Sequence, residues 1–181
     1  NGGTYTLAVV DSNGCTVTGA ADSVAEPTVV KINLDSASNV LCFGVNTGSI
    51  YVDVSGGVPG YSYLWSNSAT TEDLPSLSGG NYTLTATDTH GCSATFTLGV
   101  NSPSSAVTAS SSVTDQMQGG GLGSITLTTA GGTTPYFYSW NNGSTDTTLT
   151  GLTAGVYTCT ITDGGGCALV VTDTVDLILG L

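Results

Sequence analysis

Positive charge is almost absent from this sequence. Lys31 is the only Lys or Arg among 181 residues, against 13 Asp and Glu, so the formal net charge is −12. Nucleic-acid binding draws most of its affinity from Lys and Arg on phosphates, and anionic membrane surfaces attract clusters of the same residues. We therefore expect neither nucleic acids nor anionic membranes as partners.

Long hydrophobic runs are also missing. A membrane-spanning helix needs about 18 or more consecutive apolar residues, and the most apolar end of the chain is only Leu177-Ile178-Leu179. The sequence therefore predicts no membrane insertion. Charged residues make up only 8% of the chain and hydrophobic residues 39%. Disordered chains combine high charge with few apolar groups, so this composition favours a folded protein.

The residue types that carry catalysis are scarce. His90 is the only histidine, and it lies two residues after Asp88 in a sequence typical of a turn. No second base or nucleophile recurs beside it, as nucleophilic catalysis requires. The five cysteines are spread along the chain without the spacing of zinc ligands. We predict that the protein is not an enzyme and that it holds no cofactor.

An internal repeat is the strongest pattern that is present. Three segments begin with Tyr-Thr and end with Asp-x-x-Gly-Cys, and their tyrosines lie 77 and then 75 residues apart: residues 5–15, 82–92 and 157–167. The resulting domains are the C-terminal strands of an incomplete repeat, two complete repeats, and the start of a next repeat or a tail: residues 1–26, 27–102, 103–176 and 177–181. We expect the incomplete repeat to be completed by upstream sequence or by a neighbouring copy, because a lone hairpin is marginally stable.

Each complete repeat consists of predicted strands. Apolar residues alternate with polar ones from Cys92 to Val100, and the same period of two occurs around residues 50–54. Alternation of this kind indicates strands with one buried face, and the Gly- and Asn-rich breaks at short intervals favour a sandwich. The fold class is therefore all-β, with tandem domains of about 75 residues.

Two features narrow the type of sandwich. Tyr82 and Tyr157 both end a Leu-x-x-Gly-x-Tyr motif, which is typical of a tyrosine corner. Trp65 and Trp140 lie on the predicted third strand, where an immunoglobulin-like sandwich has its large core residue. The sequence therefore predicts immunoglobulin-like repeats in which these four residues are structural.

The combined motifs resemble a known family. Gly-Ser-Ile, Gly-Gly, Tyr-x-Tyr-x-Trp, Leu-x-x-Gly-x-Tyr-Thr and Asp-x-x-Gly-Cys follow one another in residues 123–167 and again in residues 48–92. This series is similar to the SprB-type repeat of Bacteroidota cell-surface and gliding adhesins. The resemblance implies secretion and display at the cell surface. The chain departs from its own pattern where Met117 replaces the equivalent of Cys42, and where a cysteine, Cys159, replaces a leucine.

The recurring cysteines indicate an oxidising compartment. Alternation turns Cys92 inward, and Cys42 is the only other cysteine in that repeat, so we favour a Cys42–Cys92 disulfide of about 4 kcal/mol. A Cys42–Cys167 bridge between repeats is the rival. We expect Cys15 to pair with residues upstream of the chain and Cys159 to be free.

Three kinds of ligand or modification site are compatible with the sequence. Calcium binding would use clustered carboxylates, and the weak candidates are Asp22, Glu26, Glu72 and Asp73. The aromatic residues of the third strand could form a sugar-binding platform, but a buried strand needs the same alternation, so we favour the core: Tyr61, Tyr63, Trp65, Tyr136, Tyr138 and Trp140. The resemblance also implies O-glycosylation at Asp-Ser or Asp-Thr, which gives four candidates: Ser23, Ser36, Thr147 and Thr174.

These observations predict an extracellular, cell-surface protein. The favoured function is a structural or adhesive repeat segment that forms a filament or stalk, because stacked repeats extend reach by contacting their neighbours. Its partners would be neighbouring repeats or copies of the same protein, and surface glycans. The alternative is a carbohydrate- or protein-binding module of a secreted protein.

Overall fold

The computed structural model describes residues 2–180, and all the regular secondary structure in this range is β-strand. The strands are rich in Val, Ile, Thr and Tyr, whose branched or aromatic side chains favour the pleated backbone. The described residues fall into two compact units, formed by residues 2–35, 52–72 and 83–97 and by residues 36–51, 73–82 and 98–180. This division passes through strands of the second repeat, so the repeat boundaries at 27 and 103 stay predictions.

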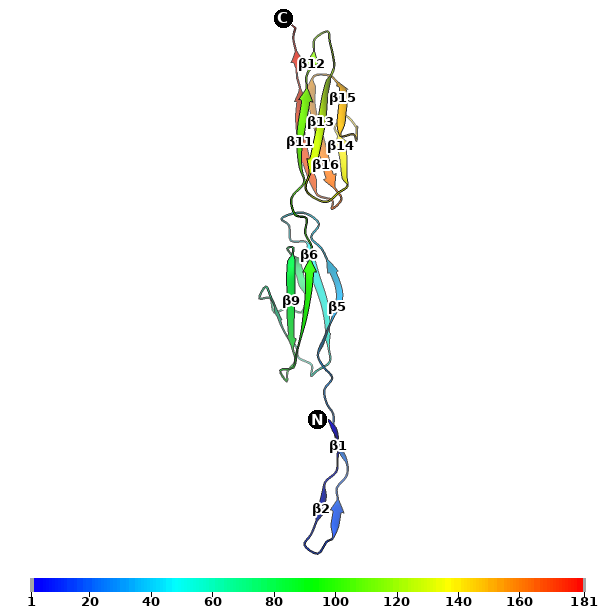
Figure 1. Ribbon diagram of the computed structural model, residues 1–181, viewed down its shortest axis with the longest axis vertical. Helices are drawn as coiled ribbons and strands as arrows, with labels where there is room; N and C mark the ends of the chain where they lie inside the picture. The colour runs from blue at the N-terminus through cyan, green and yellow to red at the C-terminus, as the bar shows by residue number, and fades with distance from the viewer. Residues whose placement is uncertain (1, 181) are drawn as a thin grey trace. The chain divides into compact units, whose positions relative to one another are not determined.

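Residues 2–26, which the sequence predicts to be the end of an incomplete repeat, form short antiparallel ladders. Strand β1 (Gly3–Tyr5) pairs with β4 (Asp22–Val24), and β2 (Ala8–Val10) pairs with β3 (Thr16–Thr18). All described residues up to Val29 are exposed, including Leu7 at 71%. These strands therefore pair with one another without enclosing a core (Figure 1).

The second repeat has two three-stranded sheets. One contains β5 (Lys31–Ser38), β6 (Gly48–Ser55) and β8 (Leu74–Leu77), in the order β5-β6-β8. The other contains β7 (Ser62–Trp65), β9 (Gly80–Thr87) and β10 (Ser93–Val100), in the order β10-β9-β7. Val30, Val54 and Ala86 form a buried cluster in the first unit. Because residues from both sheets contribute to it, the two sheets enclose a common core.

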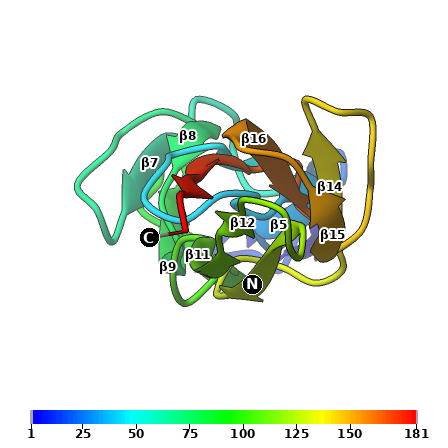
Figure 2. The ribbon, with the colours of Figure 1, turned by 90° about the horizontal axis from the view of Figure 1, so that it is seen from above.

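The third repeat has the same arrangement and lies entirely in the second unit (Figures 1 and 2). Its sheets have the strand orders β11-β13-β15 and β14-β16-β17. The strand bounds are Thr108–Thr114 (β11), Gly123–Ala130 (β13), Tyr136–Trp140 (β14), Thr148–Leu152 (β15), Gly155–Asp163 (β16) and Ala168–Val175 (β17). Ile125, Trp140, Ile161 and Val175 belong to the core between them, and each is at most 3% exposed.

The end of the chain pairs within the third repeat. Strand β18 (Leu177–Ile178) runs parallel to β12 (Gln116–Met117), with Gln116 opposite Leu177. The sequence suggested that residues 177–181 begin a next repeat or form a tail. In the structure, the described part of this segment extends the third repeat by one short parallel strand.

The aromatic residues of the repeats hold fixed hydrogen bonds. Tyr82 Oη donates to the carbonyl oxygen of Ser78 at 3.0 Å, and Tyr157 Oη donates to that of Thr153 at 2.9 Å. These bonds have the geometry of a tyrosine corner. The indole nitrogen of Trp65 donates to a backbone carbonyl at 3.0 Å, and that of Trp140 at 2.9 Å. Each indole thus fills its core while its polar atom is satisfied.

Candidate functional site at the Cys42–Cys167 bridge

The site begins with a tight turn between β16 and β17. Asp163 Oδ1 accepts hydrogen bonds from the backbone amides of Gly165 at 2.9 Å and Cys167 at 2.8 Å. Gly166 has a φ of 83°, in the left-handed region that favours glycine. The Asp-x-x-Gly-Cys motif therefore folds into a turn that its own aspartate caps, and this turn presents Cys167.

The second carboxylate oxygen of Asp163 anchors the turn to the body of the repeat. Oδ2 accepts a hydrogen bond from the Thr133 backbone amide at 2.9 Å, and the side chain is only 2% exposed. Among the backbone hydrogen bonds, this one lowers the pKa of Asp163 the most. Burial of the side chain acts in the opposite direction and raises the pKa. A buried carboxylate that accepts several amide protons is stabilised in its charged form.

The second repeat contains the same arrangement. Asp88 accepts hydrogen bonds from the amides of His90 and Cys92 through Oδ1, and from the amide of Val58 through Oδ2. The Val58 bond is the main cause of a lowered pKa of Asp88. His90 therefore lies in a capped turn, as the sequence predicted. The sequence did not predict the hydrogen bond between Asp88 and Val58 of the neighbouring loop. The recurring Gly-Gly pair just before Val58 was a signal for it.

Cys167 is joined by a disulfide to Cys42, and their Cα atoms lie 5.7 Å apart. Cys42 belongs to the loop of residues 39–47 between β5 and β6. The Leu41 carbonyl oxygen lies 3.4 Å from the Cys167 sulfur, and a Cβ atom added at Gly165 would collide with the same oxygen. The loop is therefore seated directly on the turn, and both belong to the second compact unit.

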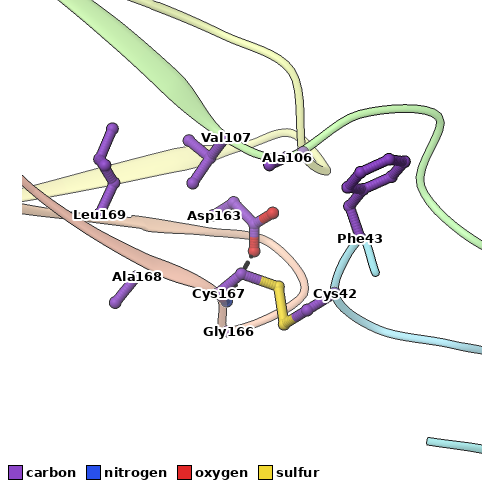
Figure 3. A pocket seen from close by; sticks show the side chains of 10 residues that line it. Cys42, Phe43, Ala106, Val107, Asp163, Gly166, Cys167, Ala168 and Leu169 are labelled. Carbon is purple, nitrogen blue, oxygen red and sulfur yellow. Dashed lines mark hydrogen bonds between the residues drawn. A yellow bond between two sulfur atoms is a disulfide. The ribbon is translucent and has the colours of Figure 1, made fainter. Parts of the chain in front are cut away.

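Phe43 extends this contact along a groove beside the bridge (Figure 3). Ala106 and Val107, at the start of the third repeat, line the groove together with Leu169 of β17. Phe43 remains 52% exposed, so the loop covers the groove without closing it. Sequence reasoning missed Phe43, although an apolar Leu-Cys-Phe run inside a Gly- and Asn-containing loop was a signal for a contact.

The favoured Cys42–Cys92 disulfide is wrong. Cys42 bonds to Cys167, and Cys92 is an exposed free cysteine. The physical reason is that β10 begins at Ser93, so Cys92 lies in the turn, where the alternation of a strand does not govern the direction of a side chain. Cys15 is also exposed and free, whereas Cys159 is free and buried, and its burial raises the pKa of its thiol.

The aromatic residues that could have formed a sugar platform pack against the cores. Trp65 and Trp140 are 2% and 3% exposed, and the four accompanying tyrosines are half-buried against the two clusters. Tyr61 and Tyr136 also donate hydrogen bonds to the backbone carbonyls of Gly56 and Gly131. These rings are therefore held by the sandwich and do not form an open stacking surface.

The remaining candidates are scattered. No group of three His, Cys, Asp or Glu placed to hold a metal ion occurs among residues 2–180. Asp22 and Glu26 are exposed, while Glu72 and Asp73 are half-buried. The four candidate O-glycosylation residues are all exposed on strands or beside them: Ser23, Ser36, Thr147 and Thr174.

The paired sheets with their shared cores define a tandem immunoglobulin-like β-sandwich protein. Residues 34–70 and 119–145 match the SprB repeat, so these two segments are similar to repeats of this type. A search of curated proteins found no match. No helix within the described range has the length and hydropathy that crossing a membrane requires.

Among solved structures, immunoglobulin-domain proteins are similar at low identity. The N-terminal eight Ig domains of Down Syndrome Cell Adhesion Molecule match at 17% identity and a TM-score of 0.49, over 97% of this chain and 28% of that one. Extracellular domains 3–5 of Drosophila OTK match at 15% identity and a TM-score of 0.40, over 99% and 72%. The chain thus spans less than a third of the first of these proteins.

Proposed function

We propose that this chain is a segment of an extracellular filament or stalk at a cell surface, with a structural or adhesive and non-catalytic role. The observation that carries the proposal is the disulfide between Cys42 and Cys167, which joins two consecutive repeats covalently. Disulfides persist in oxidising compartments outside the cytosol. A bridge between repeats also limits how far each can separate from its neighbour, which suits an array built to extend reach.

Composition supports the same proposal. The net charge of −12 and the near absence of basic residues keep copies of the chain soluble and apart. The aromatic rings that a carbohydrate-binding module would need are packed into the sandwiches. A binding role would therefore depend on loops, and the stalk role is the one that we favour.

Electron microscopy of the parent protein tests this function. We expect thin threads whose length increases in proportion to the number of repeats, and antibodies against residues 27–176 should label intact cells. Compact particles whose size does not follow repeat number would overturn the stalk, as would labelling that requires permeabilised cells. Retention of the 181-residue chain on a glycan array would instead support the binding module.

A further inference from the structure

A second groove lies beside the free cysteine of the second repeat. Residues 26–30, just before β5, line it together with Cys92 and Ser93. Val29 is 71% exposed and Cys92 is a free, exposed thiol. All of these residues belong to the first compact unit, so the groove is a feature of that unit alone.

This groove corresponds by position to the one at Cys167. Val29 and Val30 precede Ala106 and Val107 by 77 residues, and Cys92 and Ser93 precede Cys167 and Ala168 by 75. The backbone frame is also the same. The amide of Gly57 donates to the Thr28 carbonyl at 2.6 Å, and the amide of Gly132 donates to the Ser105 carbonyl at 3.0 Å.

The two turns that present the cysteines share their hydrogen bonds as well. The amide of Cys92 donates to Asp88 Oδ1 at 2.8 Å, as the amide of Cys167 donates to Asp163 Oδ1 at 2.8 Å. The two grooves therefore share their backbone frame and the position of their cysteine, although some lining residues differ, such as Val29 and Ala106. They also differ in occupancy. The groove of the third repeat holds the Cys42 and Phe43 loop of the repeat before it, and that of the second repeat is open.

We propose that the groove at Cys92 receives the equivalent Cys-Phe loop of the preceding repeat in the same polypeptide, and that the loop cysteine forms a disulfide with Cys92. The occupant is the repeat whose final strands are β1 to β4, because the Cys42 loop likewise comes from the repeat immediately before its groove. Bridges of this kind link each loop to the turn of the next repeat. The inference rests on the proposed function only in taking the repeats to follow one another in a longer array.

The bridge forms by thiol–disulfide exchange. Two cysteine thiols lose two protons and two electrons, and a disulfide oxidant such as oxidised glutathione accepts both and leaves as two thiols. The lowered pKa of Asp88 keeps its carboxylate charged, so the turn remains capped over the pH range in which exchange occurs.

The test supplies the preceding repeat. A second copy of residues 27–102 is inserted between residues 102 and 103 of the full chain. The first copy, which follows residues 1–26, carries Cys92→Ser, so the only remaining Cys92 lies in the second, inserted copy. After oxidation with a glutathione buffer, peptide mapping should find two bridges, Cys42–Cys92 and Cys42–Cys167. Adding Cys42→Ser to the first copy should free Cys92 and leave Cys167 bridged.

Two results would overturn the proposal. One is a free Cys92 in a chain whose Cys167 is bridged, and the other is a Cys42–Cys92 bridge that survives Cys42→Ser in the first copy, because that bridge lies within one repeat. Neither result affects thread length or surface labelling. The stalk proposal is therefore tested independently of this disulfide.

A second measurement decides the matter if the inserted chain does not form its Cys42–Cys167 bridge. A peptide of residues 39–47, activated as a mixed disulfide with glutathione, is offered to the unmodified chain. Cys15 is the matched control, because it ends the same Asp-x-x-Gly-Cys motif but this chain contains no counterpart of Val29 and Val30 for it. Partial burial of the Phe43 side chain, which is 52% exposed in its own groove, should favour Cys92 over Cys15 by about tenfold, relative to oxidised glutathione alone. Equal rates would overturn the proposal, and Phe43→Ser in the peptide should remove the preference.

Discussion

Asp163 and Cys167 are joined by a hydrogen bond of 2.8 Å from the cysteine amide to the buried carboxylate. The bridged cysteine is therefore presented by a turn whose geometry depends on a negative charge. Asp88 stands in the same relation to Cys92. The stability of both turns is consequently linked to the protonation of these two aspartates.

The first prediction concerns acid. The pKa values of Asp88 and Asp163 are lowered in the folded state, so between the folded value and the unfolded value of about 3.9 the unfolded chain binds more protons. Their stabilising contribution is complete above the unfolded pKa and is lost as the pH falls through the folded pKa. Urea unfolding between pH 7 and pH 2 should show midpoints that decrease below about pH 4.

The control for acid is the double variant Asp88→Asn and Asp163→Asn. It should start from a lower midpoint at pH 7, because an amide cannot accept from both sides as the carboxylate does, and its midpoint should change less with acid. An unchanged pH dependence in this variant would contradict the assignment of the effect to these residues.

The second prediction concerns the disulfide. Cys42→Ser removes a cross-link that closes a loop of 125 residues in sequence, and the chain-entropy model gives a loss of about 4–5 kcal/mol when the bridged segments unfold together. Calorimetry should show a lower melting temperature, and reduction of the native chain should reproduce it. Cys92→Ser is the matched control and should change stability by less than about 0.5 kcal/mol, since that thiol is exposed and free.

The third prediction compares the two tyrosine corners. Tyr82 is 8% exposed, whereas Tyr157 is only half-buried. Tyr82→Phe leaves the Ser78 carbonyl without its hydroxyl partner and should cost about 1–2 kcal/mol in denaturant unfolding. Tyr157→Phe should cost about half as much, because water can reach the Thr153 carbonyl. Equal losses in the two variants would show that burial does not set the strength of the corner.

Much of the fold could be predicted from the sequence, because it depends on local patterns. Alternation over β10 and the Leu-x-x-Gly-x-Tyr motif follow from short-range chemistry, and they agree with the strand and the hydroxyl contact of Tyr82. The pairing of Cys42 could not be predicted in the same way. It depends on which loop contacts the Cys167 turn, and local sequence does not determine that contact. The alternation of side chains along a strand does not apply to Cys92, because this residue precedes β10 by one position.

The fourth prediction concerns two glycines with positive φ. Gly132 has a φ of 61°, and a Cβ atom there would collide with the carboxylate of Asp163. Gly143 has a φ of 86° but open space around it. Gly143→Ala should therefore cost about 1–2 kcal/mol from backbone strain alone. Gly132→Ala should cost at least about twice as much, because the Asp163 anchor must also move. Denaturant unfolding measures both, and a loss for Gly132→Ala no larger than that for Gly143→Ala would contradict the anchor.

The short parallel ladder of β12 and β18 has a consequence for mechanical load. Strand β12 directly follows the sandwich strand β11, and β18 directly follows β17. The Gln116 and Gln118 amides donate to the Asp176 and Ile178 carbonyls at 2.9 Å. Because the strands are parallel, tension on the two ends of the chain slides one strand along the other. The interstrand hydrogen bonds are then loaded together instead of being opened one after another. On the C-terminal side, a pulling force must therefore break this ladder as a group before it can reach β17 of the sandwich.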